Sequence, residues 1–258
     1  MPHSLVESAA GVGFDCRQLT AYSEFRDAAA LYTRVFEYTD RDYSLNPNLL
    51  SALARNGGSA VGAFTPEAEL IGFAYGFAGR DAHGEDFHYS QAAAVDPAHQ
   101  GRGVGHALKF AQRDVARRWG QQSMRWTFDP LIARNAHFNL SSLGAVGIAF
   151  EPDYYGRSDT DRLVVAWDLG ETADPYRVAR EARPPVLRRA DWGMSIPTDT
   201  ARWIALPAAV SPEERSSVRT AVGQALAQSL HDGLVLVAAV RVDEETAAYL
   251  AVPQERKP

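Results

Sequence analysis

The segment VDPAHQGRGVGHAL, from Val95 to Leu108, constrains the fold of this chain more than any other. The apolar run QAAAV leads into it and predicts a strand, and an amphipathic stretch follows it. Three glycines stand within five residues, at Gly101, Gly103 and Gly105. A glycine turn at the start of a helix directs backbone N–H groups to the positive end of the helix dipole, where anions bind. The sequence therefore predicts an anion-binding loop between a strand and a helix.

Two common phosphate-binding patterns do not fit this loop. A P-loop requires Gly-Lys followed by Ser or Thr, and the chain contains no such triplet. The dinucleotide pattern G-x-G-x-x-G fails because position 106 is His106 rather than glycine. A turn that uses glycine only for close packing is the competing interpretation, but such a turn rarely needs three glycines around Arg102. An anion close to the backbone explains the pattern better.

Strands and helices alternate along the first two thirds of the chain, which predicts an α/β (α+β) layer fold. Apolar residues recur every three or four positions from Val104 to Trp119, and Gly120 follows, so a helix is expected there. Two more helices are expected over 23–38 and 129–142. Strands are expected within 54–64, 69–79, 88–95, 123–128, 148–156 and 162–169.

The composition of the sequence changes after Leu169, where a connection rich in proline and charged residues begins. A helix is expected over 212–231, with Ser211 as its N-cap, and a final buried strand is expected over 234–240. We therefore expect a catalytic domain and a C-terminal helix–strand extension that packs on it. Their expected bounds are 15–170 and 171–258.

Composition argues against several classes of function. The net charge of the 258 residues is −6, which disfavours nucleic-acid binding. Cys16 is the single cysteine, so no intrachain disulfide forms and a reducing compartment is compatible. No apolar run approaches the roughly 18 residues that span a bilayer, and the first ten residues lack the basic and apolar regions of a signal peptide. We expect a cytoplasmic protein that binds neither membranes nor nucleic acids.

The glycine loop, with Val95-Asp96-Pro97 before it, resembles motif A (Q/R-x-x-G-x-G/A) of the GNAT superfamily of acyl-CoA-dependent N-acyltransferases. The resemblance extends over residues 15–170. The strings WTFDPL, RNAHFNLSSLGA, EPDYYG and DRLVVAW follow the loop in the same order as in a largely uncharacterised subgroup of predicted GNAT acetyltransferases. This resemblance implies the GNAT fold, with a mixed central sheet flanked by helices.

The resemblance also implies that the loop binds the pyrophosphate of acetyl-CoA or of another acyl-CoA co-substrate. The backbone amides from Gly101 to His106 would hold it, and Arg102 would add a charge-assisted contact. In GNAT folds the strand before the loop leaves a backbone N–H free for the thioester oxygen, and here that strand is QAAAV.

Residues of two further segments complete the set that the resemblance implies for the cofactor. Asn135 and Asn139 lie one helical turn apart and could hydrogen-bond the pantetheine arm or the acceptor, although an asparagine near a helix start is also a common cap. The expected cofactor-binding residues are Ala93, Val95, Gln100, Gly101, Arg102, Gly103, Val104, Gly105, His106, Asn135 and Asn139.

Only a neutral amine attacks a thioester, so the reaction needs a base. Many relatives place a glutamate on the strand before the loop, and this chain has none between Tyr89 and Val95. Asp129 is the first candidate to bind or deprotonate the amine, but an Asp-Pro pair at a helix entrance is equally well explained as an N-cap. His88 is a weaker candidate, because a lone histidine at a strand edge more often has a structural role.

The departing thiolate needs a proton, and many relatives use a tyrosine four residues before the glycine that ends the second helix of the domain. Here that position is Leu140. Tyr154 and Tyr155 are the nearest alternatives in sequence order, although tyrosines at such a strand end more often have packing roles. The histidines and the cysteine show no spacing typical of a metal site, so no metal is expected.

The sequence thus predicts an N-acyltransferase that moves acetyl or another short acyl group from acyl-CoA to the amine of a small metabolite, with a homodimer as one expected state. A coenzyme A-binding regulatory or interaction domain without catalysis is the alternative. The missing strand glutamate and Leu140 favour this alternative, whereas the glycine loop and Asp129 favour the enzyme.

Overall fold

The computed structural model describes residues 13–40, 43–170, 173–199 and 201–255. The chain forms two compact units, one that ends at Met124 and one that begins at Arg125. The sequence predicts a domain boundary at residue 170. Residues 125–170 of the expected first domain lie in the unit that begins at Arg125, together with the C-terminal extension. Residues 1–12, which are not expected to form a signal peptide, lie outside the described residues.

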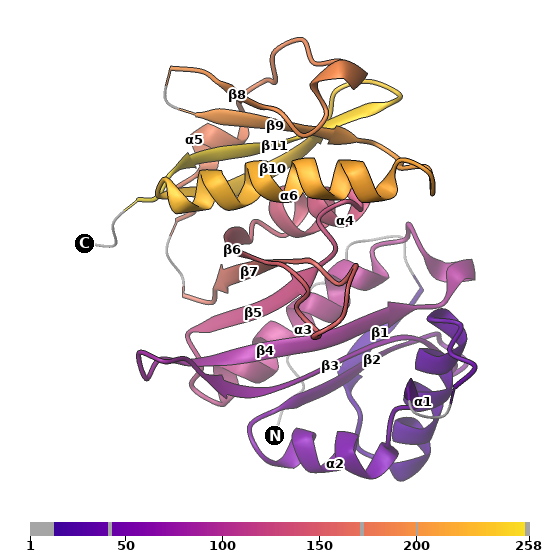
Figure 1. Cartoon of the computed structure of the whole chain (residues 1–258). Coiled ribbons are helices and arrows are strands. Elements are labelled where there is room, and N and C mark those ends of the chain that lie inside the picture. Colours follow the sequence, from indigo (N-terminus) through magenta and orange to yellow (C-terminus); the bar gives the residue numbers. More distant parts are fainter. Residues whose placement is uncertain (1–12, 41–42, 171–172, 200, 256–258) are drawn as a thin grey trace. The chain divides into compact units, whose positions relative to one another are not determined.

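The first unit contains the antiparallel strand order β1-β2-β3-β4 (Figure 1). The expected hairpin is formed by β2 and β3, in which Ala60 lies opposite Tyr75. The elements of this unit are β1 (Asp15–Gln18), α1 (Tyr22–Val35), α2 (Pro47–Arg55), β2 (Ser59–Phe64), β3 (Leu70–Arg80), β4 (Asp86–Val95), the short 3-10 helix η2 (Pro97–His99) and α3 (Val104–Arg118).

Helices cover both faces of this sheet. Neighbouring residues of a strand point to opposite faces, and in β2 the adjacent residues Ala60 and Val61 belong to two different apolar clusters. The cluster with Ala60 is closed by α1 and α2, for example through Phe25 and Leu50. The cluster with Val61 is closed by α3, for example through Leu108. The sheet therefore holds α3, and with it the glycine loop, on one face.

The second unit contains the strand order β5-β7-β6-β10-β11-β9-β8. Its helix α6 contacts β6, β9 and β10 (Figure 1). The elements are β5 (Ser123–Phe128), which leads into this unit, α4 (Ala133–Ala136), the π-helix η3 (His137–Ser142), β6 (Val146–Glu151), β7 (Arg162–Asp168), α5 (Arg177–Arg180), the 3-10 helix η4 (Arg189–Asp191), β8 (Ser195–Pro197), β9 (Arg202–Pro207), α6 (Arg215–His231), β10 (Leu234–Arg241) and β11 (Thr246–Pro253).

Each unit thus combines a largely antiparallel sheet with flanking helices, which confirms the α/β (α+β) class. The strand expected over 234–240 is confirmed as β10. It is not the final element, because β11 follows it and pairs with both β10 and β9. In the described part of the chain, no helix is long and apolar enough to cross a bilayer.

Several predicted boundaries are wrong. The helix expected over 23–38 ends at Val35, and three further differences lie in the second unit. The helix expected from Asp129 begins at Ala133, because Asp129 and Pro130 form a turn. The strand expected over 148–156 ends at Glu151, and PDYYG forms a turn. The helix expected from position 212 begins at Arg215, after a turn over 212–214.

Candidate functional site

The glycine loop is anchored at its first residues by side chains of the same unit. The Oδ1 atom of Asp96 accepts from the Ala98 amide at 3.0 Å, and its Oδ2 atom lies 2.8 Å from Arg34 Nη2. The Arg34 guanidinium holds the pKa of the Asp96 carboxyl below its usual value. The Gln100 amide group donates to the Val95 carbonyl at 3.2 Å. The exit of β4 into the loop is therefore fixed.

Glycine is required at two positions of the loop. The φ angles of Gly101 and Gly103 are 74° and 81°, in the left-handed region that other residues enter only with strain. A Cβ atom at either position would meet no other atom within 4 Å. The requirement therefore comes from the backbone conformation, and the space beside both residues is open.

The loop presents backbone donors at the start of α3. The first amide bonded to the helix is that of Ala107, which donates to the Gly103 carbonyl at 3.0 Å. Within the described ranges, the amides from Gly101 to His106 donate to no backbone carbonyl. Such amides carry the positive end of the helix dipole. Open space, unpaired amides and the exposed Arg102 guanidinium fit the pyrophosphate of coenzyme A.

The side chains of two loop residues pack against the protein rather than point into the open space beside the loop. Val104 is buried in the cluster beneath α3. The His106 imidazole stacks on Phe110, with ring centroids 4.5 Å apart. Burial and then the nearby Arg113 charge lower the pKa of His106. The His106 ring packs against a residue one turn further along α3.

The strand β4 carries a β-bulge just before the residues expected to meet the thioester. Ala92 lies opposite Tyr75, but Ser90 lies opposite Gly76, so Gln91 is an extra residue on β4. After the bulge, Ala93 is exposed and Ala94 is buried in the core.

A chain of buried polar side chains links α3 to β2 and β4. Lys109 Nζ donates to Ser90 Oγ at 2.8 Å, and Ser90 Oγ donates to Gln112 Oε1 at 2.8 Å. Gln112 Nε2 donates to Ser59 Oγ at 3.1 Å. None of these four side chains is exposed by more than 5%. We refer to these residues, together with His88 and Gln121, as the polar chain.

The polar chain continues through His88 and fixes its tautomer. His88 Nδ1 lies 3.0 Å from Gln121 Oε1, which is an acceptor, so Nδ1 carries the proton. His88 Nε2 then accepts from the Ser59 hydroxyl at 2.8 Å. Burial lowers the pKa of His88 to about 4 and that of Lys109 to about 7. In the sequence, the sign of this network is the polar residue Gln112 on the apolar face of α3.

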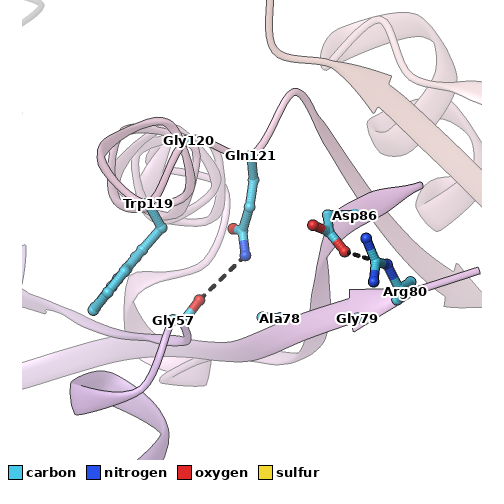
Figure 2. A pocket seen from close by; sticks show the side chains of 8 residues that line it. All are labelled: Gly57, Ala78, Gly79, Arg80, Asp86, Trp119, Gly120 and Gln121. Atoms are coloured by element: carbon cyan, nitrogen blue, oxygen red, sulfur yellow. Dashed lines mark hydrogen bonds and ion pairs between the residues drawn. The ribbon is translucent and has the colours of Figure 1, made fainter. Parts of the chain in front are cut away.

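The last member of the polar chain lines a hollow at the far end of α3 from the glycine loop. Gln121 Nε2 donates to the Gly57 carbonyl at 3.3 Å, and Arg80 Nε lies 3.0 Å from Asp86 Oδ1 (Figure 2). The hollow measures about 340 Å³. Its lining residues are Gly57, Ala78, Gly79, Arg80, Asp86, Trp119, Gly120 and Gln121.

In the second unit, Asp129 is held by two groups. Its Oδ1 atom accepts from the Leu131 amide at 2.9 Å, and its Oδ2 atom lies 2.7 Å from Arg215 Nη2. Near this carboxylate, the Tyr249 hydroxyl donates to the Pro130 carbonyl at 2.7 Å. Burial and then the charge of Asp129 raise the pKa of Tyr249 well above its usual value. Asp129 thus forms an Asx turn and an ion pair, rather than the expected helix N-cap.

The tyrosines predicted as acid candidates lie in the turn between β6 and β7. Tyr154 and Tyr155 are both exposed, with ring centroids 5.0 Å apart and planes at 89°. The Arg162 guanidinium lies over the Tyr155 ring, 5.1 Å from its centroid. The Tyr155 amide donates to Thr160 Oγ1 at 3.2 Å.

Three residues of the predicted second helix have different surroundings. Asn135 is half-buried. Asn139 is buried, accepts from Trp126 Nε1 at 2.8 Å and donates to the Asn135 carbonyl at 2.8 Å. Leu140, at the position of the expected acid, is fully buried among apolar residues. A structural role accounts for Asn139, and its contact with coenzyme A stays a prediction.

The single cysteine is a protonated thiol at neutral pH. Burial, with a smaller contribution from Asp15, raises the pKa of the Cys16 thiol to about 12, which keeps it protonated at pH 7. Among the residues that the structure describes, no three His, Cys, Asp or Glu side chains are grouped so as to hold a metal ion.

A family model agrees with the loop and its surroundings. The model described as the acetyltransferase (GNAT) family matches residues 15–138, a segment that includes β4, the glycine loop and α3. No protein of curated function matches the chain.

The structure was also compared with solved protein structures. A protein assigned as an acetyltransferase, yncA of Salmonella typhimurium with its cofactor acetyl-CoA, is 21% identical, with a TM-score of 0.50 over 64% of this chain and 98% of that chain. At this identity the likeness shows a shared fold. A GNAT-family protein of Desulfovibrio desulfuricans, 16% identical, covers 61% of this chain and 99% of its own with a TM-score of 0.48.

Proposed function

Because the acetyltransferase (GNAT) family model matches residues 15–138, we propose that this chain is a GNAT acyltransferase and transfers an acetyl or other short acyl group from acyl-CoA to the amine of a small metabolite. The observation that carries the proposal is the loop from Gly101 to His106, whose amides donate to no backbone carbonyl in the described chain. Coenzyme A would supply the acyl group as a thioester, with Gln100, Arg102 and Val104 completing its phosphate site.

The proposed reaction forms a C–N bond between the amine and the acyl carbon and breaks the C–S bond of the thioester. Charge develops on the carbonyl oxygen, and we propose that backbone N–H groups between Ala93 and Val95 stabilise it. The exposed position of Ala93 and the bulge at Gln91 support this assignment, because a bulge redirects the strand at that point.

Proton transfer is assigned to side chains of the second unit. We propose that Asp129 binds the ammonium group or accepts its proton before attack, and that Tyr155 or Tyr154 protonates the departing thiolate. The exposed positions of Tyr154 and Tyr155 support the second assignment. We propose further that Asn135 and Asn139 contact the pantetheine arm. The single cysteine is compatible with a reducing compartment, and we propose the cytoplasm.

A second candidate function is coenzyme A binding without catalysis. Three observations favour it: β4 offers no glutamate from Tyr89 to Val95, Leu140 replaces the expected acid, and Asp129 is already paired with Arg215. In this case the glycine loop would bind acyl-CoA as a signal or structural ligand.

A two-part experiment tests both candidates. Acetyl-CoA, succinyl-CoA and free coenzyme A are added to the protein, and thermal unfolding is followed. Release of free thiol is then measured with L- and D-amino acids, spermidine and tyramine. Acyl transfer predicts a raised Tm and thiol release that depends on an amine. Binding without amine-dependent release would favour the second candidate, and no Tm shift with any acyl-CoA would sink both.

A further inference from the structure

Helix α6 buries an arginine among three carboxylates of the second unit. Arg219 is only 8% exposed, and its Nε atom lies 3.2 Å from Asp159 Oδ1. Its Nη1 atom lies 3.9 Å from Asp161 Oδ2, and its Nη2 atom lies 4.0 Å from Asp129 Oδ2. A buried guanidinium is costly unless charges of opposite sign surround it. The three guanidinium nitrogens of Arg219 have no hydrogen-bond partner among the described residues, so the three carboxylates compensate the buried charge electrostatically.

Because of the position of α6, the Arg219 side chain lies next to the segment between β6 and β7. Arg215, Arg219 and Gly223 are four residues apart and share one face of the helix. At Gly223 a Cβ atom would lie 2.8 Å from the Phe150 ring, so α6 approaches β6 more closely there than a larger residue would allow. One helical turn earlier, Arg219 reaches the residues that follow β6.

The segment 152–161, which we call the tyrosine loop, has a backbone that needs such support. Asp153 and Asp159 have φ angles of 46° and 63°, in the left-handed region that non-glycine residues enter with strain. The Asp153 amide donates to Asp161 Oδ1 at 3.0 Å, and Arg219 contacts both Asp159 and Asp161. Strained residues of this kind persist only where surrounding contacts hold them.

The tyrosine loop presents its aromatic side chains outward. Tyr154 and Tyr155 are 38% and 46% exposed, although aromatic rings gain free energy from burial. The Arg162 guanidinium already lies over the Tyr155 ring. Within this loop the Tyr154 ring and the Asp159 carboxylate, whose side chain is 72% exposed, are the features that attract an ammonium group.

We infer that Arg219 is a positioning residue through which the C-terminal helix α6 holds the tyrosine loop, so that Tyr154 and Tyr155 contact the acceptor amine. The inference rests on the proposed acyl transfer. It gives the C-terminal extension a role in acceptor recognition, and it assigns the extension no part in binding acyl-CoA.

The test combines proteolysis with two-substrate kinetics on the full chain. Variants R219Q and R219K are compared with R202Q, which removes an ion pair between Arg202 and Asp232 of the same unit but away from the tyrosine loop. Trypsin cleavage after the exposed Arg157 is followed by mass spectrometry. KM is measured for acetyl-CoA and for the amine of the above panel that gives the fastest thiol release.

For R219Q we expect cleavage at least tenfold faster and an amine KM raised at least fivefold, with the acetyl-CoA KM within twofold of wild type. R219K should be intermediate, and R202Q should match wild type. Equal changes in both KM values, or wild-type cleavage and kinetics in R219Q, would overturn the inference. If R219Q does not fold, D159N removes one partner of Arg219 at an exposed site and serves the same comparison.

The two proposals can fail separately. Absence of an acetyl-CoA effect on the Tm of wild type would end the proposed function, while cleavage after Arg157 would still report whether Arg219 holds the loop. If acetyl-CoA raises the Tm of wild type and the amine KM of R219Q is unchanged, only the inference about Arg219 is contradicted.

Discussion

The Oδ2 atom of Asp129 lies 2.7 Å from Arg215 Nη2, which joins the turn after β5 to the first turn of α6. The residue proposed to act on the amine is therefore held by the C-terminal part of the chain. Its Oδ1 atom accepts from the Leu131 amide at 2.9 Å. Because both carboxylate oxygens are engaged, Asp129 is oriented for a catalytic role, and it also stabilises the fold. These two roles predict different effects of substitutions on activity and on stability.

Asp129→Asn separates these roles. If Asp129 handles the amine proton, kcat/KM for the amine falls about 100-fold or more, because general bases contribute at least that factor. The acetyl-CoA KM should stay within twofold of wild type. Steady-state kinetics with each substrate varied in turn measures both values.

Arg215→Gln is the matched control, since it breaks the same ion pair and leaves the carboxylate in place. Both variants should lose about 1 kcal/mol of stability, as expected for a charged hydrogen bond. Only D129N should lose activity. A D129N protein with wild-type kinetics and reduced stability would leave Asp129 as a turn residue alone.

Gly103→Val should weaken acyl-CoA binding. Gly103 has a φ of 81° and caps α3, and a β-branched residue would move the loop out of this conformation. We expect the Kd for acetyl-CoA to rise at least tenfold, or about 1.4 kcal/mol, by calorimetry.

Gly84→Val provides the control for backbone strain. Gly84 has a φ of 86° and equally open surroundings, but it lies in the turn between β3 and β4. Both variants should lose similar stability, and only G103V should lose affinity. If G84V weakens acetyl-CoA binding as much as G103V does, the effect comes from general destabilisation and the assignment of the loop is wrong.

The loop was predictable because its signals are local. Left-handed glycines and the start of an amphipathic helix lie within a few neighbouring residues, and the helix expected over 104–119 is confirmed as α3. The α/β class followed for the same reason, from periodicity within single elements. The strand β11, which is buried between β10 and β9, was not predicted because its apolar run is rich in alanine, a residue depleted in strands.

The polar contacts were not predictable because their partners are far apart in the sequence. Gln112 and Ser59 are separated by 53 positions, and Arg215 and Asp129 by 86. Arg219 lies within the apolar stripe of α6, and only the fold shows which carboxylates surround it. A single sequence shows that a polar residue interrupts the apolar face of a helix, but it does not show which residues that polar side chain contacts.

His88→Gln should remove part of the acid sensitivity of the fold. The pKa of His88 falls from 6.5 to about 4 on folding, so between these pH values the unfolded chain binds a proton that the folded chain does not. Stability is therefore lost as pH falls from 6.5 to 4, by about 3 kcal/mol from this group.

The measurement is urea unfolding of wild type and H88Q at several pH values from 4 to 7. The difference between the two slopes of unfolding free energy against pH isolates one proton, since all other groups are shared. Identical slopes would mean that His88 has the same pKa in the folded and the unfolded chain, which would contradict its burial in the polar chain.

Lys109 can be observed directly, because Lys109 and Lys257 are the two lysines of the chain. Burial lowers the pKa of Lys109 from 10.5 to about 7, so from pH 7 upward the unfolded chain binds one more proton than the folded chain. Stability should therefore rise with pH above 7, by up to about 1.4 kcal/mol per unit. With lysine labelled in ¹⁵N, the Nζ signal that is lost in K109M should titrate near pH 7, and K109M should lack the rise in stability. A Lys109 signal that titrates near 10 would show that the ammonium is solvated and would remove Lys109 from the polar chain.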